Sequence, residues 1–156
     1  MVLKKAGEMR MDEFIKMLDE NLDYLGHEIL GDTVIIHVAS NREDVQCPYC
    51  GSISNRMHST YERSFQDLPV MGKKCKLIIN NRKMFCPNPN CGHTTFAEKF
   101  EFLLPKGKKT KRLLDKIVDV SLSISSVAAA GILKDGIVDI GKSTICNLLK
   151  KRYTPS

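Results

Sequence analysis

Two pairs of cysteines constrain this chain more than any other feature. The first pair is Cys47 and Cys50 in CPYCG, and the second is Cys86 and Cys91 in CPNPNCG. Each pair brackets a tight turn, and Gly51 can adopt the positive φ that lets backbone N–H groups point at thiolate sulfur. Residues 51–85 separate the pairs, which is enough chain for two strands to run out and return. Both turns can therefore face one metal ion.

Four thiolates around one ion form a closed tetrahedral shell, with Zn–S bonds of about 2.3 Å and no open position for water. The N-terminal MVLKKAGEMRMDEF lacks the apolar stretch of a secretory signal, so we expect a cytoplasmic protein. In that reducing compartment, paired cysteines indicate a metal more often than a disulfide. Rubredoxin-like iron and a redox dithiol are the alternatives, although the second turn lacks their C-x-x-C. We predict one structural zinc ion.

Other histidines and cysteines are weaker candidate ligands. His93 follows Cys91 by two residues and could replace it, but four cysteines already complete the shell. His37 and His58 have no partner at ligand spacing. Cys75 lies on the apolar face of an expected strand and Cys146 in an expected helix, where free cysteines usually act as small hydrophobes. We expect neither to be a nucleophile.

Charge divides the chain into an acidic start and a basic remainder. Residues 1–46 carry 5 Lys and Arg against 10 Asp and Glu, residues 47–96 carry 7 against 2, and residues 97–156 carry 12 against 6. The formal net charge is +6. A basic surface of this extent favours a polyanionic partner such as nucleic acid, and a solvated basic surface is the alternative. No apolar run approaches the roughly 20 residues of a membrane span.

The first two thirds of the chain predict one helix and a small β-structure. Phe14, Ile15, Leu18 and Leu22 recur at helical spacing, which predicts a helix over residues 12–22. TVIIHVAS alternates apolar residues from Val34, which predicts a strand after a turn at residues 31–32. Further strands are expected near STYERSF and in KCKLIINNRKMF.

The last third predicts three short helices behind a basic segment. Five basic residues stand within the seven positions after Pro105, in a basic linker or helix start: Lys106, Lys108, Lys109, Lys111 and Arg112. The first helix starts near Thr110. Ser125 or Ser126 caps the second, which ends at Gly136, a residue suited to the left-handed position after a helix. The third begins at Gly141 or Ser143.

Three short helices with a basic last one indicate a helix-turn-helix. The third helix exposes groups able to bind base edges or phosphates: Lys142, Ser143, Asn147, Lys150, Lys151 and Arg152. The connection DGIVDI is longer than the three or four residues of a tight helix-turn-helix turn. A generic three-helix packing unit is therefore the alternative.

The order of these motifs resembles the N-terminal part of transposases of the ISL-three family of insertion sequences. HSTYERSFQDLP between the cysteine pairs and RKMFCPNPNC at the second pair are the most specific pieces. The resemblance implies that the four cysteines bind zinc and that the last three helices form the DNA-binding helix-turn-helix. It also implies that these modules bind the inverted repeats at the ends of the element.

We therefore expect an α+β chain in three parts. Residues 1–45 form an N-terminal helix and β-hairpin, residues 46–100 a zinc-ribbon-like β-module, and residues 101–156 a three-helix helix-turn-helix bundle. The RNase H-like catalytic domain of such transposases does not occur within this sequence, so we expect a DNA-binding portion that is not an enzyme.

The expected partner is double-stranded DNA, with association with the bacterial nucleoid and no small-molecule substrate or membrane. A homodimer is a further possibility, since the acidic N-terminal segment could meet the basic helices of a second copy. A stand-alone transcription regulator and a zinc-stabilised protein-interaction module are the alternative functions.

Overall fold

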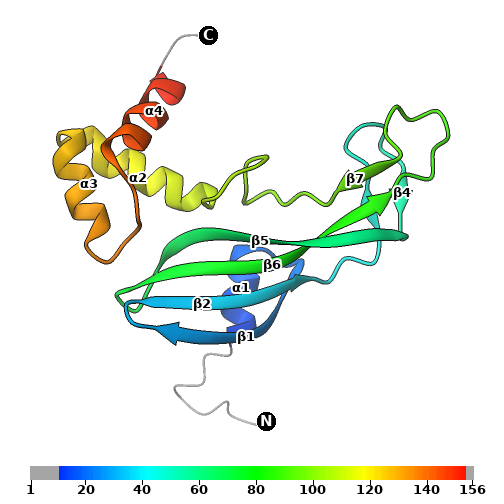
Figure 1. The fold of residues 1–156 in the computed structure, drawn as a ribbon, viewed down its shortest axis with the longest axis horizontal. Coiled ribbons are helices and arrows are strands. Elements are labelled where there is room, and N and C mark those ends of the chain that lie inside the picture. The colour runs from blue at the N-terminus through cyan, green and yellow to red at the C-terminus, as the bar shows by residue number, and fades with distance from the viewer. Residues whose placement is uncertain (1–10, 154–156) are drawn as a thin grey trace. The chain divides into compact units, whose positions relative to one another are not determined.

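The chain is a mixed α+β protein, described here for residues 11–153 of a computed structural model (Figure 1). The described residues form two compact units. The first contains residues 11–26, His37–Arg63 and Ile79–Lys99, and the second contains His27–Ile36, Ser64–Ile78 and the chain from Phe100 onward. Helices and strands confirm the α+β class. The division into three sequence segments stays a prediction.

The N-terminal helix is shorter than its apolar periodicity predicts. Helix α1 covers Met11–Leu18 and buries Ile15. The side chain of Asp19 then accepts a hydrogen bond of 2.8 Å from the Asn21 backbone N–H, and β1 begins at once, covering Leu22–Leu30. The predicted helical end over residues 19–22 is wrong because this Asp-centred turn redirects the chain. Leu22 is buried as the first residue of a strand.

Four long strands form the body of the sheet, in the order β1-β2-β6-β5, and β7 pairs with β6. Strand β2 covers Thr33–Ser40, β5 covers Met57–Val70 and β6 covers Lys73–Phe85. Alternate residues of β2 and β6 are buried, as the sequence predicts: Val34, Ile36, Val38, Cys75, Leu77 and Ile79. Strand β5 runs well beyond the predicted STYERSF and includes Pro69, which an edge strand tolerates.

Three short strands flank the cysteines. Strands β3, Val45–Gln46, and β4, Ile53–Ser54, form one small hairpin, with Val45 opposite Ser54. Strand β7, Thr95–Ala97, pairs antiparallel with the end of β6, and Phe96 lies opposite Met84. The cysteine turns therefore join paired strands on both sides.

The C-terminal helices occur where the sequence predicts them. Helix α2 covers Lys111–Ser123 after the N-cap Thr110, α3 covers Ser126–Lys134 after the N-cap Ser125, and α4 covers Lys142–Tyr153. Each N-cap hydroxyl accepts a backbone hydrogen bond from the first turn of its helix. Gly136 follows α3 with φ 84°, as predicted for a residue after a helix end.

The three C-terminal helices share one apolar core within the second unit. Its buried members are Leu113, Ile117, Ala129, Ala130, Leu133, Val138, Ile140 and Ile145. Val138 and Ile140 belong to the connection between α3 and α4, so this connection is long because it contributes to the core. Among residues 11–153, no helix combines the length and apolar character that crossing a bilayer requires.

Candidate metal centre and nucleic-acid interface

The first cysteine turn is a tight loop between β3 and β4. The Gly51 N–H donates to the carbonyl of Cys47 at 2.9 Å, and the Cys47 N–H donates to the carbonyl of Ser52 at 2.8 Å. Gly51 adopts φ 80°, a conformation that L side chains rarely adopt. The turn therefore depends on glycine at this position, as CPYCG predicts.

The second cysteine turn lies between β6 and β7. The Cys86 N–H donates to the carbonyl of Thr94 at 2.9 Å, and the Cys91 N–H donates to the carbonyl of Asn88 at 3.1 Å. The side-chain oxygen of Asn88 also accepts a hydrogen bond of 3.0 Å from the Asn90 N–H. These contacts hold the wider CPNPNC loop in one compact shape.

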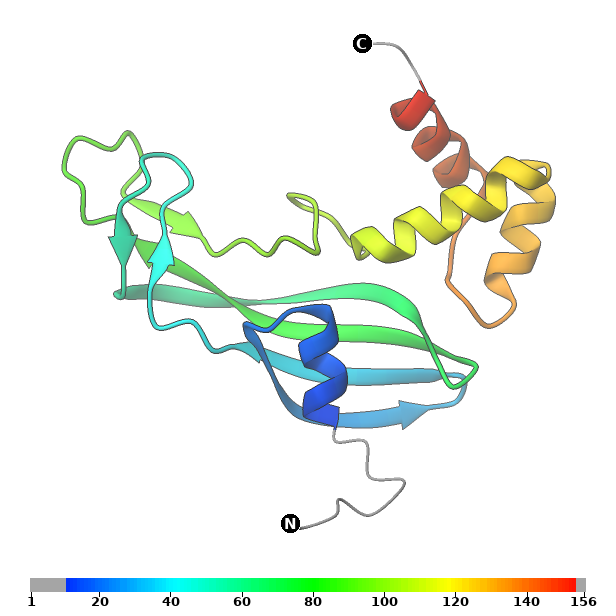
Figure 2. The same cartoon turned by 180° about the vertical axis from the view of Figure 1, so that it is seen from behind.

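The two turns bring all four predicted sulfurs together. The Sγ atoms of Cys47, Cys50, Cys86 and Cys91 lie within 4.8 Å of one another, and the Cys50 and Cys86 sulfurs are 3.5 Å apart. A tetrahedral zinc ion with Zn–S bonds of about 2.3 Å would separate its sulfurs by about 3.8 Å. The two loops lie side by side in both views of the fold (Figures 1 and 2). The donor set and its spacing therefore fit zinc.

Thiol ionisation in this cluster depends on local hydrogen bonds and on the neighbouring thiols. Hydrogen bonds from the side chain and backbone of Ser52 lower the pKa of the Cys50 thiol to about 6. A hydrogen bond from the Asn88 backbone lowers the pKa of Cys86, but burial and the adjacent thiols outweigh it and raise that pKa to about 12. Bound zinc supplies the positive charge that keeps all four groups as thiolates.

A small apolar core packs against the metal centre. Val45, Cys47, Met84 and Phe96 are buried together, and Cys86 and Cys91 pack against them. These residues come from both hairpins, so the core joins the first turn to the second. This core is too small to stabilise a domain by itself. Small domains with so little buried apolar surface usually depend on a structural metal.

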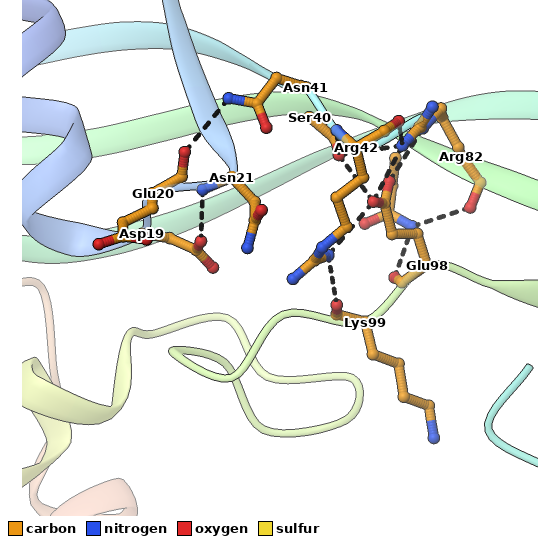
Figure 3. Close-up of polar contacts among 10 residues, drawn as sticks. Asp19, Glu20, Asn21, Ser40, Asn41, Arg42, Arg82, Glu98 and Lys99 are labelled. Atoms are coloured by element: carbon orange, nitrogen blue, oxygen red, sulfur yellow. Dashed lines mark hydrogen bonds and ion pairs between the residues drawn. The ribbon is translucent and has the colours of Figure 1, made fainter. Parts of the chain in front are cut away.

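A buried carboxylate fixes the chain that leaves β7 (Figure 3). The Glu98 side chain is fully buried and accepts hydrogen bonds of 3.0 Å from Arg82 Nε, 3.2 Å from Arg42 Nη1 and 2.7 Å from the Ser40 hydroxyl. Arg42 also donates to the carbonyl of Lys99 at 3.0 Å. This cluster ties β7 to β2 and β6, and sequence reasoning did not identify it because its members are far apart along the chain.

The outer surface of the metal centre carries a stacked aromatic pair. The rings of Tyr49 and His93 are 3.5 Å apart between centroids and inclined by 8°. Tyr49 belongs to the first turn, and His93 follows the second. His93 therefore contacts the opposite loop through its ring face, and the four-sulfur group does not require it as a ligand.

The predicted basic segment is attached to β5. The Gln66 N–H donates to the carbonyl of Lys108, and the Thr110 N–H donates to the carbonyl of Gln66, both at 2.9 Å. The side chains of Lys106, Lys108 and Lys111 are exposed. Lys109 is partly buried, and this burial is the larger cause of its lowered pKa. The positive charge of Lys108 lowers that pKa further.

Arg112 differs from the four lysines because it already has a protein partner. Its guanidinium forms an ion pair with the buried carboxylate of Asp67, through Nε at 2.8 Å and through Nη2. The Thr110 hydroxyl donates to the same carboxylate at 2.7 Å. Asp67 was not singled out in the sequence, since an isolated acidic residue in a strand gives no signal of its role.

The predicted residues of the last helix lie together on α4. Lys142, Ser143, Asn147, Lys150 and Lys151 are exposed, while Ile145 is fully buried on the opposite side. Arg152 belongs to the last turn of α4, and its side chain lies outside the described part of the structure. The structure thus places these polar residues on one helix, and the basic segment runs into the first turn of α2 within the same unit.

The sequence model of a protein family described as the zinc-finger of transposase IS204/IS1001/IS1096/IS1165 matches residues 43–93. No curated protein and no solved structure matches the chain. The matched segment contains all four cysteines whose sulfurs the structure brings together, and it does not extend to the C-terminal helices. Residues 43–93 are therefore a zinc-ribbon domain of this transposase family, with Cys47, Cys50, Cys86 and Cys91 as the ligands of one structural zinc ion.

Proposed function

We propose that this chain is the zinc-dependent, DNA-binding portion of a transposase, which recognises the terminal inverted repeats of its element. The single observation that carries the proposal is the match of residues 43–93 to a transposase zinc-finger family. The chemistry of the C-terminal helices supports the same role, since a basic, polar helix face suits a nucleic acid.

In this proposal α2, α3 and α4 act as a helix-turn-helix, with α4 in the major groove. The shared core of the three helices supports this arrangement, because Ile145 enters the core from one side of α4 while Lys142 and Asn147 are exposed on the other. Lys142, Ser143 and Asn147 would contact base edges, and Asn147 is suited to a bidentate contact with adenine. Lys150, Lys151 and Arg152 would bind phosphates near the end of the same helix.

The basic segment would contact the DNA backbone mainly through its lysines. Lys106, Lys108 and Lys111 are exposed, whereas Arg112 is held by Asp67. The backbone pairing of Lys108 and Thr110 with Gln66 limits the movement of this segment, which reduces the entropy lost on binding. We assign end binding, and not strand cleavage, to these residues.

The proposal is tested by selecting sequences from a random duplex library at two salt concentrations, with zinc-loaded protein and a chelated control. We expect a recovered motif that is lost on chelation. Its match to an element end supports transposition, and its match to a promoter supports the alternative of a transcription regulator. Binding without any motif that disappears at moderate salt would contradict sequence-specific recognition.

A zinc-stabilised protein-interaction module is a second candidate, and one observation favours it. Leu122, Val127 and Ile132 are 57%, 63% and 52% exposed on α2 and α3, although all three are large apolar residues. Exposed apolar side chains mark a protein contact where they form a continuous patch. Weak, salt-insensitive DNA binding in the library experiment would favour this candidate over the first.

A further inference from the structure

A cavity of about 240 Å³ in the second unit lies apart from the residues that the sequence assigns to DNA, except for Lys108. We call it the sheet cavity. Its lining includes Ser64 from β5, Lys74 and Lys76 from β6, and Asp139 from the connection between α3 and α4. It is smaller than the roughly 300–1,000 Å³ of pockets for drug-sized ligands, so it suits a small chemical group.

The alternation of the strands places the polar lining on the face opposite the core. Lys74 and Lys76 alternate with the buried Cys75 and Leu77 along β6. Ser64 likewise precedes the buried Phe65 on β5. Because successive strand residues point to opposite faces, these lysine and serine side chains project away from the apolar side of the sheet.

The acidic residue in the lining is already neutralised. Lys74 Nζ lies 2.8 Å from Asp139 Oδ1 and 3.6 Å from Asp32 Oδ2. The ammonium groups of Lys76 and Lys108 have no hydrogen bond or ion pair with any residue in the described part of the chain. The lining therefore contains two lysines without an acidic partner among the described residues, beside Lys74, which Asp139 and Asp32 share.

The position of Lys108 is fixed by its backbone. Its carbonyl accepts the hydrogen bond from the Gln66 N–H on β5, and Gln66 also lines the cavity. The Gln66 side-chain oxygen accepts a hydrogen bond of 3.3 Å from the Asp139 N–H. The backbone of Lys108 is therefore held beside the sheet, next to the cavity that this residue lines.

We propose that the sheet cavity binds a phosphate group through Lys76, Lys108 and the hydroxyl of Ser64. Two ammonium groups and a hydroxyl supply the charge and the hydrogen-bond donors that phosphate oxygens accept. This inference rests on the proposed function, because it assumes that the phosphate belongs to a DNA backbone. The sheet then contributes to backbone binding together with α4.

Lys76→Ala is the decisive variant because Lys76 lies outside both basic regions recognised in the sequence. We expect the salt dependence of binding to a short duplex of arbitrary sequence to lose about one unit of slope, and Lys76→Ala with Lys108→Ala to lose about two. Lys116→Ala is the matched control, since Lys116 is exposed on α2 and does not line the cavity. Its slope should equal that of the unmodified protein.

Titration of inorganic phosphate into the zinc-loaded protein, followed by NMR at constant ionic strength, separates the two possible sources of phosphate. We expect shifts at the Ser64 and Lys76 amides that the double variant loses. Such shifts without any duplex binding would assign the cavity to a free anion and contradict the proposed function. If the double variant binds duplex with an unchanged salt-dependence slope, and phosphate causes no amide shifts, the sheet cavity is not a phosphate site. The proposed function would then be unaffected.

Discussion

The buried carboxylate of Asp67 forms an ion pair with the partly exposed Arg112 across 45 positions of sequence. Asp67 is 3% exposed, and its carboxylate also accepts a hydrogen bond from the Thr110 hydroxyl, which caps α2. The start of α2 is therefore fastened to β5 by a side-chain network as well as by backbone hydrogen bonds. This network links the N-cap of a helix to the sheet within the second unit.

Arg112→Ala should destabilise the protein because it leaves the Asp67 carboxylate buried with the Thr110 hydroxyl as its remaining side-chain donor. Removal of one partner of a fully buried pair costs roughly 3–5 kcal/mol, and we expect about 2 kcal/mol here since Arg112 is partly exposed. Urea denaturation of the zinc-loaded protein measures the change. Lys111→Ala, one position earlier and exposed, should change the free energy of unfolding by less than about 0.5 kcal/mol. Equal losses in both variants would contradict the role of the ion pair.

Cys91→Ser should abolish stoichiometric zinc binding, because a hydroxyl replaces one of four thiolates in a closed shell. Zinc content after dialysis measures this, and Cys146→Ser is the control, since Cys146 belongs to α4 and is not part of the four-sulfur group. The control should keep one zinc ion per chain. Zinc retained in Cys91→Ser, but lost when His93→Ala is added, would show that His93 can serve as the fourth ligand.

Local sequence signals predicted much of this structure correctly. The helix start near Thr110, the cap expected at Ser125 or Ser126, the glycine after α3 and the turn at Gly51 are each decided by residues within a few positions. The long hairpin of β5 and β6 also follows from the sequence, because two cysteine turns can share a metal only if the chain between them returns. These features need no knowledge of distant neighbours.

The contacts that fasten these elements together could not be predicted in the same way. Five basic residues near α2 look equivalent in sequence, yet Arg112 is paired with Asp67 while Lys108 lines a cavity. Glu98 is buried among Arg82 of β6, Ser40 of β2 and Arg42, which follows β2. The Glu98 contacts depend on the pairing of β2 with β6, and the Asp67 pair depends on where α2 begins beside β5; periodicity alone specifies neither.

Cys75 should resist alkylation in the folded protein. Burial is the main cause that raises the pKa of its thiol to about 12, and the negative charge of Asp67 is the second cause. At about pH 8 the thiolate fraction is therefore on the order of one in ten thousand, and it increases only as the pH rises toward that value. Mass spectrometry after brief iodoacetamide treatment of zinc-loaded protein should find label on the partly exposed Cys146 before Cys75. Rapid labelling of Cys75 without denaturant would contradict its burial.

Asn147→Ala should relax DNA sequence preference without removing DNA binding. A bidentate contact between asparagine and adenine discriminates by about 1–3 kcal/mol, so the preferred motif should lose information at one position, while Lys109→Ala should weaken all sequences alike. Selection from the random duplex library measures both effects. Asn80→Ala is the matched control, because Asn80 is exposed on β6 and is not part of the C-terminal helices. If the Asn147 variant recovers the same motif as the Asn80 variant and the unmodified protein, α4 does not read bases through Asn147.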